Sequence, residues 1–396
     1  MPAPARRAPA PAAPPYFAIT APGLEALTAA ELVALGITPL GTEVGGVSFG
    51  GTPGTLYRAN LHLRTATRVI ARVGEFEARH FADLEKKSKQ QPWTDFLTAK
   101  RPVKLRVTCK KSKLYHSDAV AQRISGAIAH VLGSAPVAAK PDDEDDDDGA
   151  QLVIARILHD RCTISVDSSG ALLHRRGYRL QTAKAPLRET LAAAMLLGSG
   201  WNPETPLLDP MCGAGTIAIE GALLSRRIAP GSRREFAFIQ WPRFDGALWQ
   251  RMLEASRERE LPRAPAPIVA SDRDAGAIAA ATANAERAGV AADIEFSRRA
   301  LSAITPPAAP GWIVTNPPYG VRVGDKKALR DLYAQFGNVA RRSCAGWTVA
   351  MLSASAELER QTGLPLEVAL KTRNGGVPVR LVSAVVPTTM EHPPAA

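Results

Sequence analysis

The chain of 396 residues carries a formal net charge of +11 and has an isoelectric point near 9.7. Its apolar content of 45% is ordinary for a globular protein, and its length allows two or three domains with separate cores. No apolar run approaches the ~20 residues of a membrane span, so we expect no membrane association. The excess of positive charge favours a polyanionic partner.

Cysteine usage and the N-terminal sequence indicate a reducing compartment. The four cysteines form no Cys-x-x-Cys pair, which argues against a zinc knuckle or a disulfide framework: Cys109, Cys162, Cys212 and Cys344. The N-terminus has no apolar core followed by a cleavage site, so we expect no signal peptide. We therefore predict a cytoplasmic protein, which we also expect to be a monomer without a bound metal.

The first 75 residues divide into a tail and a small folded unit. Residues 1–15 consist of Met, Pro, Ala and Arg, which cannot form a core, and they predict a disordered tail. Residues 16–75 predict an α+β segment. Its expected elements are a strand at 16–20, a helix at about 23–35, strands near 43–49 and a helix at about 54–65.

Residues 76–168 form a basic module. Between Lys86 and Lys113 there are ten lysines and arginines against a single acid, whereas a solvated helix face mixes both signs. A strand at 104–109 alternates apolar and basic residues, which predicts basic side chains on an open face. The residues that we predict to bind a polyanion are Lys104, Arg106, Lys110, Lys111 and Lys113.

The remaining elements of this module are a helix at 117–132 and alternating strands at 152–157 and 162–166. Seven consecutive acids at 142–148 offer carboxylates for Mg²⁺ or Ca²⁺. The run lacks the alternating spacing of a defined ion site, so we interpret it as an exposed loop.

From residue 186 onwards strands and helices alternate. Pro186 suits an N-terminal helical position, and the pattern ends in an antiparallel pair around Asn374-Gly375-Gly376. This series predicts an α/β fold with a doubly wound sheet and an antiparallel edge. The predicted strands are 207–209, 268–272, 294–297, 312–315, 347–353, 366–372 and 377–386, and the later predicted helices are 216–226, 274–288 and 327–342.

A glycine-rich turn follows the first of these strands and begins a helix; it reads Asp209-Pro210-Met211-Cys212-Gly213-Ala214-Gly215-Thr216. Gly213 and Gly215 let the backbone approach a ligand, and no Gly-Lys-Ser/Thr follows, which excludes a P-loop. The carboxylate expected at the ribose hydroxyls is Asp272, which lies 57 residues past Gly215 instead of about 20. An insertion at 226–261 explains the distance, and a nucleoside ligand is favoured over NAD.

Asp209 stands just before this turn, where a carboxylate suits a ligand with an ammonium group. S-adenosylmethionine has such a group together with ribose and adenine, and it needs no phosphate site. The alternative role for Asp209 is a helix N-cap. Met211 of the same turn is predicted to contact the cofactor, whereas Cys212 is interpreted as a pocket wall because no histidine lies near these motifs in the sequence.

A second motif, Asn316-Pro317-Pro318-Tyr319, ends a short apolar strand. The Asn316 amide oxygen and the Pro317 carbonyl can accept the two N–H donors of a planar amine, while the Tyr319 ring can stack on the base that carries it. Two acceptors on one amine favour the tetrahedral nitrogen of a transition state. The alternative is a proline-rich turn with a buried tyrosine.

Together these motifs predict methyl transfer from S-adenosylmethionine to a base amine. With the lead-in Gly177-Tyr178-Arg179, the glycine-rich turn, Asp272 and the Asn-Pro-Pro-Tyr motif, the sequence resembles the THUMP-containing, Rossmann-fold RNA methyltransferases. The resemblance runs from about Tyr16 to the C-terminus and is greatest to the methylating N-terminal half of bacterial 23S rRNA guanine-N2 methyltransferases. No second methyltransferase unit follows in this sequence, so we expect a single catalytic unit.

The resemblance implies a fold and a set of binding residues. It implies a ferredoxin-like segment at 16–75, an RNA-binding THUMP domain at 76–168 and a class I methyltransferase domain at 169–390. It also implies that structured RNA is the partner and that Asn316–Tyr319 hold the target base. The residues implied to hold the cofactor are Thr190, Asp209, Gly213, Gly215 and Asp272.

One position departs from the family pattern. Members carry an acid after the third strand of the catalytic sheet that receives the adenine amine, and Ala300 occupies that place here, with Ser297, Ser302 or a backbone carbonyl as possible substitutes. Four alternatives stay open at this point: a tRNA guanine-N2 methyltransferase, an adenine-N6 methyltransferase of RNA or DNA, an RNA-binding protein whose methylating half is idle, and a nicotinamide oxidoreductase.

Overall fold

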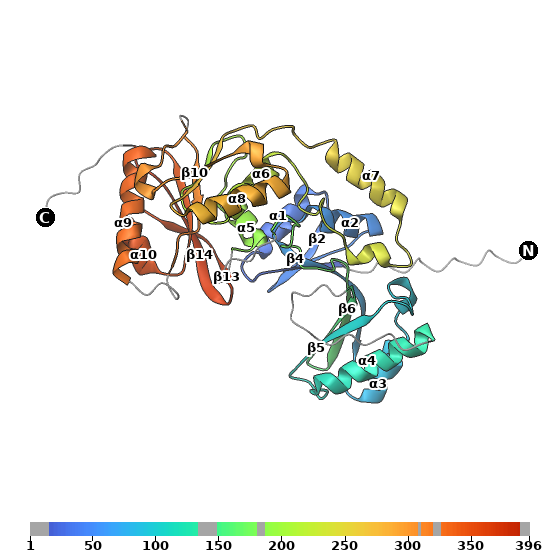
Figure 1. Cartoon of the computed structure of the whole chain (residues 1–396). Coiled ribbons are helices and arrows are strands. Elements are labelled where there is room, and N and C mark those ends of the chain that lie inside the picture. The colour runs from blue at the N-terminus through green and yellow to red at the C-terminus, as the bar shows by residue number, and fades with distance from the viewer. Residues whose placement is uncertain (1–15, 134–148, 180–186, 308–309, 320–325, 389–396) are drawn as a thin grey trace, which may run out of the picture.

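Two seven-stranded sheets organise the protein (Figure 1). The computed structural model describes residues 16–133, 149–179, 187–307, 310–319 and 326–388. Three predictions lie outside these residues: the tail at 1–15, the acidic run at 142–148 and the helix start at Pro186.

The first sheet has the strand order β2-β3-β1-β4-β7-β6-β5, and all of its neighbouring strands are antiparallel except the pair β5 and β6. Its strands are β1 (Tyr16–Thr20), β2 (Pro39–Glu43), β3 (Gly46–Phe49), β4 (Ala66–Glu77), β5 (Val103–Lys110), β6 (Gln151–Leu158) and β7 (Arg161–Asp167). The helices of this part are α1 (Glu25–Ala34), α2 (Pro53–His62), α3 (Phe81–Lys89) and α4 (Ser117–Leu132).

Strand β4 was not predicted, and it joins the two N-terminal segments. Its 12 residues pair with β1 at one end and with β7 at the other, so strands from 16–75 and from 76–168 belong to one continuous sheet. Helix α3 was also missed, because few apolar residues mark its buried side, where Leu84 is fully buried.

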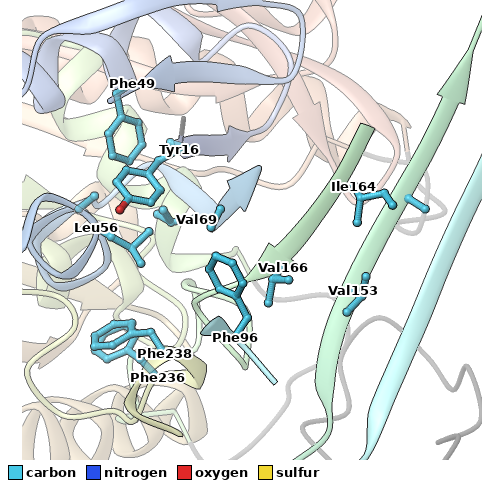
Figure 2. Packing of buried hydrophobic residues seen from close by; sticks show 14 of the residues in the cluster. Tyr16, Phe49, Leu56, Val69, Phe96, Val153, Ile164, Val166, Phe236 and Phe238 are labelled. Carbon is cyan, nitrogen blue, oxygen red and sulfur yellow. The ribbon is translucent and has the colours of Figure 1, made fainter. Parts of the chain in front are cut away.

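The insertion at 226–261, which the sequence analysis used only to explain the distance between Gly215 and Asp272, completes the core of this first part. Phe238 of the insertion stacks on Tyr57 of α2 with ring centroids 4.5 Å apart. Trp249 of α7 (Gly246–Arg257) meets Phe238 edge-on at 5.3 Å. Figure 2 shows Phe236 and Phe238 in the same cluster as the apolar side chains of the sheet. Aromatic burial of this size stabilises the contact strongly.

The second sheet has the strand order β10-β9-β8-β11-β12-β14-β13. The first five strands are parallel, while β14 runs antiparallel to both of its neighbours, as predicted. The strands are β8 (Leu207–Asp209), β9 (Ile268–Asp272), β10 (Ile294–Arg298), β11 (Trp312–Thr315), β12 (Thr348–Ser353), β13 (Glu367–Asn374) and β14 (Val377–Val385).

Helices cover both faces of this sheet, which confirms the doubly wound prediction. Neighbouring strand residues enter opposite apolar clusters: Leu207 and Val314 join one cluster, and Leu208 and Ile313 join the other. The first cluster contains α5 (Glu189–Gly198), α6 (Thr216–Ser225) and α8 (Ala275–Ala288), and the second contains α9 (Lys326–Ser343) and the unpredicted α10 (Ala356–Gln361).

A buried charged group connects the two parts of the molecule. Glu220 of α6 is 1% exposed and lies 3.5 Å from the Arg176 guanidinium and 4.0 Å from that of Arg64. Tyr178 donates a hydrogen bond of 3.2 Å to Glu220. Arg64 precedes β4 and also donates to the carbonyl of Ile228 at 2.6 Å. One carboxylate on the methyltransferase sheet's helix therefore compensates two buried arginines, one of them from the first part.

Candidate active site

The glycine-rich turn connects β8 to α6 in a left-handed backbone conformation. Gly213 has φ +51° and Gly215 has φ +80°, values that favour glycine strongly. A Cβ atom on Gly215 would lie 2.9 Å from the Cβ of Ala281, so this glycine also lets α6 and α8 approach closely. A Cβ atom on Gly213 would meet nothing within 4 Å among the described residues, which leaves room for a ligand over this turn.

Asp272 and the turn are in direct contact despite their separation in sequence. The Gly213 amide donates to Asp272 Oδ2 at 3.0 Å, and the Asp274 amide donates to Asp272 Oδ1 at 3.0 Å. The Cys212 amide donates to the carbonyl of Ser271 at 3.0 Å. The adjacent strands β8 and β9 bring these groups together, because both parallel strands end at the same edge of the sheet. The predicted insertion thus separates them in the chain and not in space.

The Asn-Pro-Pro-Tyr motif lies beside the same turn. The Thr315 hydroxyl at the end of β11 donates to Asp209 Oδ1 at 2.8 Å, and the Met211 amide donates to the same oxygen at 3.3 Å. Strands β8 and β11 are neighbours, and the strand order reverses between them. This switch point is where open α/β sheets bind ligands. The two motifs therefore meet at one edge.

Burial controls the ionisation of the carboxylate at this junction. Asp209 is 1% exposed, and burial together with the nearby Asp272 carboxylate raises the pKa of Asp209 to about 7. The hydrogen bonds from Thr315 and Met211 oppose this shift. A cationic ligand group would favour the ionised form.

Asn316 presents an acceptor without a partner. Its Oδ1 atom is buried and makes no hydrogen bond with the described residues. Buried polar atoms are rarely left unpaired, so this oxygen marks a place for a donor from a ligand. Pro317 is buried and Pro318 is exposed.

Tyr319 is partly buried, and its hydroxyl is held by a residue that the sequence did not predict for the site. Asn374 Nδ2 donates to Tyr319 Oη at 2.6 Å. Asn374 ends β13 at the two-glycine turn before β14, and only its turn chemistry was visible in the sequence. Burial raises the pKa of Tyr319.

Thr190 lies in the first turn of α5 and is 4% exposed. A second unpredicted contact holds this region: Arg179 donates to the Thr216 hydroxyl at 2.7 Å and forms an ion pair of 3.2 Å with Glu189. Burial raises the pKa of Glu189 to about 7, against the effect of Arg179. Arg179 thus ties the beginning of α5 to the beginning of α6.

The region around Ala300 offers hydroxyl groups in place of the missing acid. Ser297 of β10 is in register with Ser271 of β9, and both hydroxyls are buried without a hydrogen-bond partner among the described residues. The ring of Phe296 lies 3.4 Å from the position of a Cβ on Gly215. Unpaired hydroxyls, the open side of Gly213 and the Asp272 carboxylate fit the polar edges of a nucleoside.

The predicted RNA-binding residues differ in exposure. Lys110, Lys111 and Lys113 are exposed, and Arg106 is half-buried. Lys104 is 8% exposed, so the expectation of an open face was wrong at this residue. Val103, the preceding residue of β5, is also buried, so both faces of the strand are covered at this end.

Among the residues that the structure describes there is no group of three or more potential metal ligands, and no helix is long and apolar enough to cross a membrane. Cys212 is buried, and burial raises the pKa of its thiol far above its usual value, which agrees with a pocket wall and not with a nucleophile.

The strand order, the glycine-rich turn after β8, the carboxylate after β9 and the motif after β11 define a class I methyltransferase, whose methyl donor is S-adenosylmethionine. The model of the RMKL-like methyltransferase domain family, UPF0020, matches residues 176–381, and that of the RlmL ferredoxin-like domain matches residues 15–70. The chain belongs to the RMKL-like methyltransferase family.

Relatives of known sequence agree with this assignment. A putative RNA methyltransferase of Synechocystis is 37% identical, with 93% of this chain and 96% of that protein covered. The ribosomal RNA large subunit methyltransferase K/L of Syntrophotalea carbinolica is 38% identical over 93% of this chain and 53% of its own length. The chain thus spans about half the length of the K/L relatives that it matches.

Two solved structures share the fold over nearly their whole length. A protein of Listeria monocytogenes, described as a predicted N6-adenine-specific DNA methylase, superposes with a TM-score of 0.84 at 33% identity, covering 94% of this chain and 96% of that one. SMU.472, a putative methyltransferase complexed with SAH, gives a TM-score of 0.82 at 29% identity, covering 95% and 99%.

Proposed function

We propose that this protein methylates the exocyclic N2 amine of a guanine in 23S rRNA. The observation that carries the proposal is the Thr315–Asp209 hydrogen bond of 2.8 Å, because it ties the residue before Asn316, whose amide oxygen is buried and unpaired, to the start of the glycine-rich turn. The names of the Synechocystis and Syntrophotalea relatives support an RNA substrate and, for the latter, ribosomal RNA.

Residues of this chain would prepare the amine for attack. A base amine is a weak nucleophile because its lone pair is delocalised into the ring. Asn316 Oδ1 and the Pro317 carbonyl accept its two N–H groups, which favours the tetrahedral nitrogen of the transition state over the planar ground state. The Tyr319 ring stacks on the flipped base and keeps it in the pocket. The proton leaves after the nitrogen has become cationic, so no strong general base is required.

The cofactor would be held at the adjacent turn. When bound, S-adenosylmethionine supplies an electrophilic methyl group on a sulfonium. Gly213, Gly215 and Met211 form the turn that faces it, Asp272 is assigned to the ribose hydroxyls, and Asp209 is assigned to the ammonium group. Thr190 of α5 completes this set. Ser297 is assigned to the adenine amine, because Ala300 stands where other family members have an acid.

The first part of the molecule is assigned to RNA binding. The ferredoxin-like segment and a THUMP domain at 76–168 would bind RNA together, and the exposed lysines of residues 76–168 would contact the phosphate backbone. Each phosphate contact adds roughly 0.7–0.9 to the slope of log affinity against log salt. Such a protein works in the cytoplasm as a monomer on rRNA or on a pre-ribosomal particle.

A second candidate keeps the cofactor and changes the base. The same two acceptors suit the N6 amine of adenine, and the Listeria relative is described as a predicted N6-adenine-specific DNA methylase. A tRNA guanine is a third possible target, because the acceptors do not distinguish RNA classes.

The test is methylated-nucleoside analysis of RNA from a knockout strain. Deletion of the gene removes one N2-methylguanosine from 23S rRNA, and the wild-type gene restores it, whereas Asn316→Ala does not. Mapping by primer extension locates the nucleotide. Loss of N6-methyladenosine instead, or a loss confined to tRNA or DNA, identifies one of the other targets. Unchanged methylation of all three nucleic acids contradicts the proposal.

A further inference from the structure

An exposed aromatic side chain lies in the basic loop, which we define as residues 110–116, from the last residue of β5 to the residue before α4. Tyr115 is 69% exposed, although its neighbour Leu114 is 4% exposed and belongs to the core of the first part. A tyrosine ring this exposed contributes little to folding, because burial is what makes aromatic residues stabilising.

The loop is held in one shape by hydrogen bonds to the β6–β7 turn. The Ser112 hydroxyl donates to the Lys110 carbonyl at 2.8 Å and accepts from the Asp160 amide at 3.0 Å. The Lys113 amide donates to Asp160 Oδ1 at 2.7 Å. Lys111 adopts φ +50°, which is uncommon for a residue other than glycine. These contacts order the loop before any partner binds, which lowers the entropic cost of binding.

The ring is placed among groups that attract a nucleotide. His116 contacts Tyr115 with ring centroids 4.1 Å apart at a tilt of 42°. Lys110, Lys111 and Lys113 are exposed on the same loop. Two acids adjoin the loop: Asp160, which accepts from the Lys113 backbone amide and lies 3.8 Å from the Arg79 guanidinium, and Asp118 in the first turn of α4. Positive charge beside an open aromatic face is the combination that single-stranded nucleic acids recognise.

We propose that Tyr115, backed by His116, is a stacking platform for an unpaired RNA base, and that the three lysines of the basic loop bind the adjoining phosphates. This inference rests on the proposed RNA substrate and specifies its form: a loop, bulge or single-stranded end. A continuous duplex does not fit, because base faces are covered within the stack and the deep groove of A-form RNA is closed to side chains.

The test compares two RNA probes of equal length, a hairpin with an unpaired loop and a fully paired duplex. Binding to the full-length protein is followed by fluorescence anisotropy over a KCl series. Tyr115→Ala should weaken hairpin binding roughly 5- to 100-fold, the usual cost of a lost base stack, without changing the salt slope. Tyr115→Phe should retain the affinity, and duplex binding should be unaffected by either change.

Two further variants distinguish the contribution of base stacking from that of positive charge and from that of any exposed apolar side chain. The triple variant Lys110→Ala, Lys111→Ala, Lys113→Ala should lower the salt slope by about 2 to 3. Leu40→Ala removes another exposed apolar side chain, 67% exposed on β2, and should change neither probe's affinity. A hairpin carrying 5-iodouridine in its loop should photocrosslink to the peptide that contains Tyr115, as mass spectrometry would reveal.

Two results would contradict the proposal that Tyr115 stacks on an unpaired base. One is an equal hairpin affinity of the wild type and Tyr115→Ala, and the other is an equal weakening of hairpin and duplex binding by Tyr115→Ala. These results leave the proposed function standing if the wild type still transfers methyl groups to rRNA in a separate assay. Failure of the wild type to methylate any RNA contradicts the proposed function itself.

Discussion

The two sheets of this protein have the same number of strands but differ in the relative direction of those strands. The sheet of the first part is antiparallel except for one pair at its β5 edge, whereas the methyltransferase sheet is parallel except for β14. The carboxyl ends of antiparallel strands alternate between the two opposite sides of the sheet at which strands end. The carboxyl ends of parallel strands all lie on the same one of these two sides.

This difference bears on where the proposed catalysis and the proposed RNA recognition lie. At the parallel edge three distant segments converge, ending at Asp209, Asp272 and Thr315, and hydrogen bonds join them around the glycine-rich turn. The antiparallel sheet has no such common edge. It presents a long face and its connecting loops, of which the basic loop is one, and this arrangement suits a large partner that is held at several points.

The largest expected effect comes from cutting the connection between the two parts. Glu220→Ala leaves Arg64 and Arg176 buried without their carboxylate, and we expect the free energy of unfolding to fall by about 3–5 kcal/mol. Urea denaturation measures it. The matched control is Glu357→Ala in the exposed ion pair with Arg330, which should cost about 0–1 kcal/mol. Similar losses in both variants would contradict the structural role of Glu220.

The next largest effect should come from removing the unpaired acceptor Asn316. This change should impair methyl transfer at the carboxyl ends of the parallel strands and leave the first part of the molecule unaffected. Asn316→Ala should reduce single-turnover methyl transfer by about two to three orders of magnitude, as for a lost transition-state contact. Binding of S-adenosylhomocysteine and of RNA should persist in calorimetry. An unchanged rate on the true RNA substrate would show that Asn316 does not hold the reacting amine.

Asp209 should make stability depend on pH. Its pKa of about 7 in the folded protein exceeds the ordinary value of 3.8, so ionisation of Asp209 favours unfolding, and this penalty grows from about pH 4 to pH 7 and is constant above. Asp209→Asn cannot ionise. Relative to the wild type, this variant should gain stability as the pH rises through that window, measured by urea denaturation at pH 5, 6, 7 and 8. A constant difference would indicate that Asp209 stays ionised throughout.

The smallest effect concerns the hairpin between β13 and β14, which reaches the pocket through Asn374. Asn374→Ala should lower kcat about 2- to 10-fold, the cost of one hydrogen bond of ~0.5–1.5 kcal/mol, because Tyr319 loses its fixed orientation. Tyr319→Phe should have the same effect, and the double variant no more than either. Additive losses would mean that the two residues act separately. Asn338→Ala on α9 serves as the control.

Much of the methyltransferase sheet could be predicted from its sequence, because each strand is a short apolar run with a clear end. Strand β11 and helix α4 have the bounds that were predicted. Strand β4 and helix α3 were missed: β4 mixes arginines and glutamates with its apolar residues, and α3 buries little besides Leu84. Tertiary pairing, and not local pattern, decides such elements.

The sequence by itself determined the chemical groups of this protein: the glycines that a left-handed turn needs, the carboxylates after two strands, and two prolines that end a third. Only the tertiary structure decided which of these groups meet, since the order of strands in a sheet is not the order in the chain. It also placed Asn374 against the Tyr319 hydroxyl and the insertion's aromatic residues in the core of the first part. Local residue types fix what a segment can bind, whereas long-range pairing fixes what lies beside it.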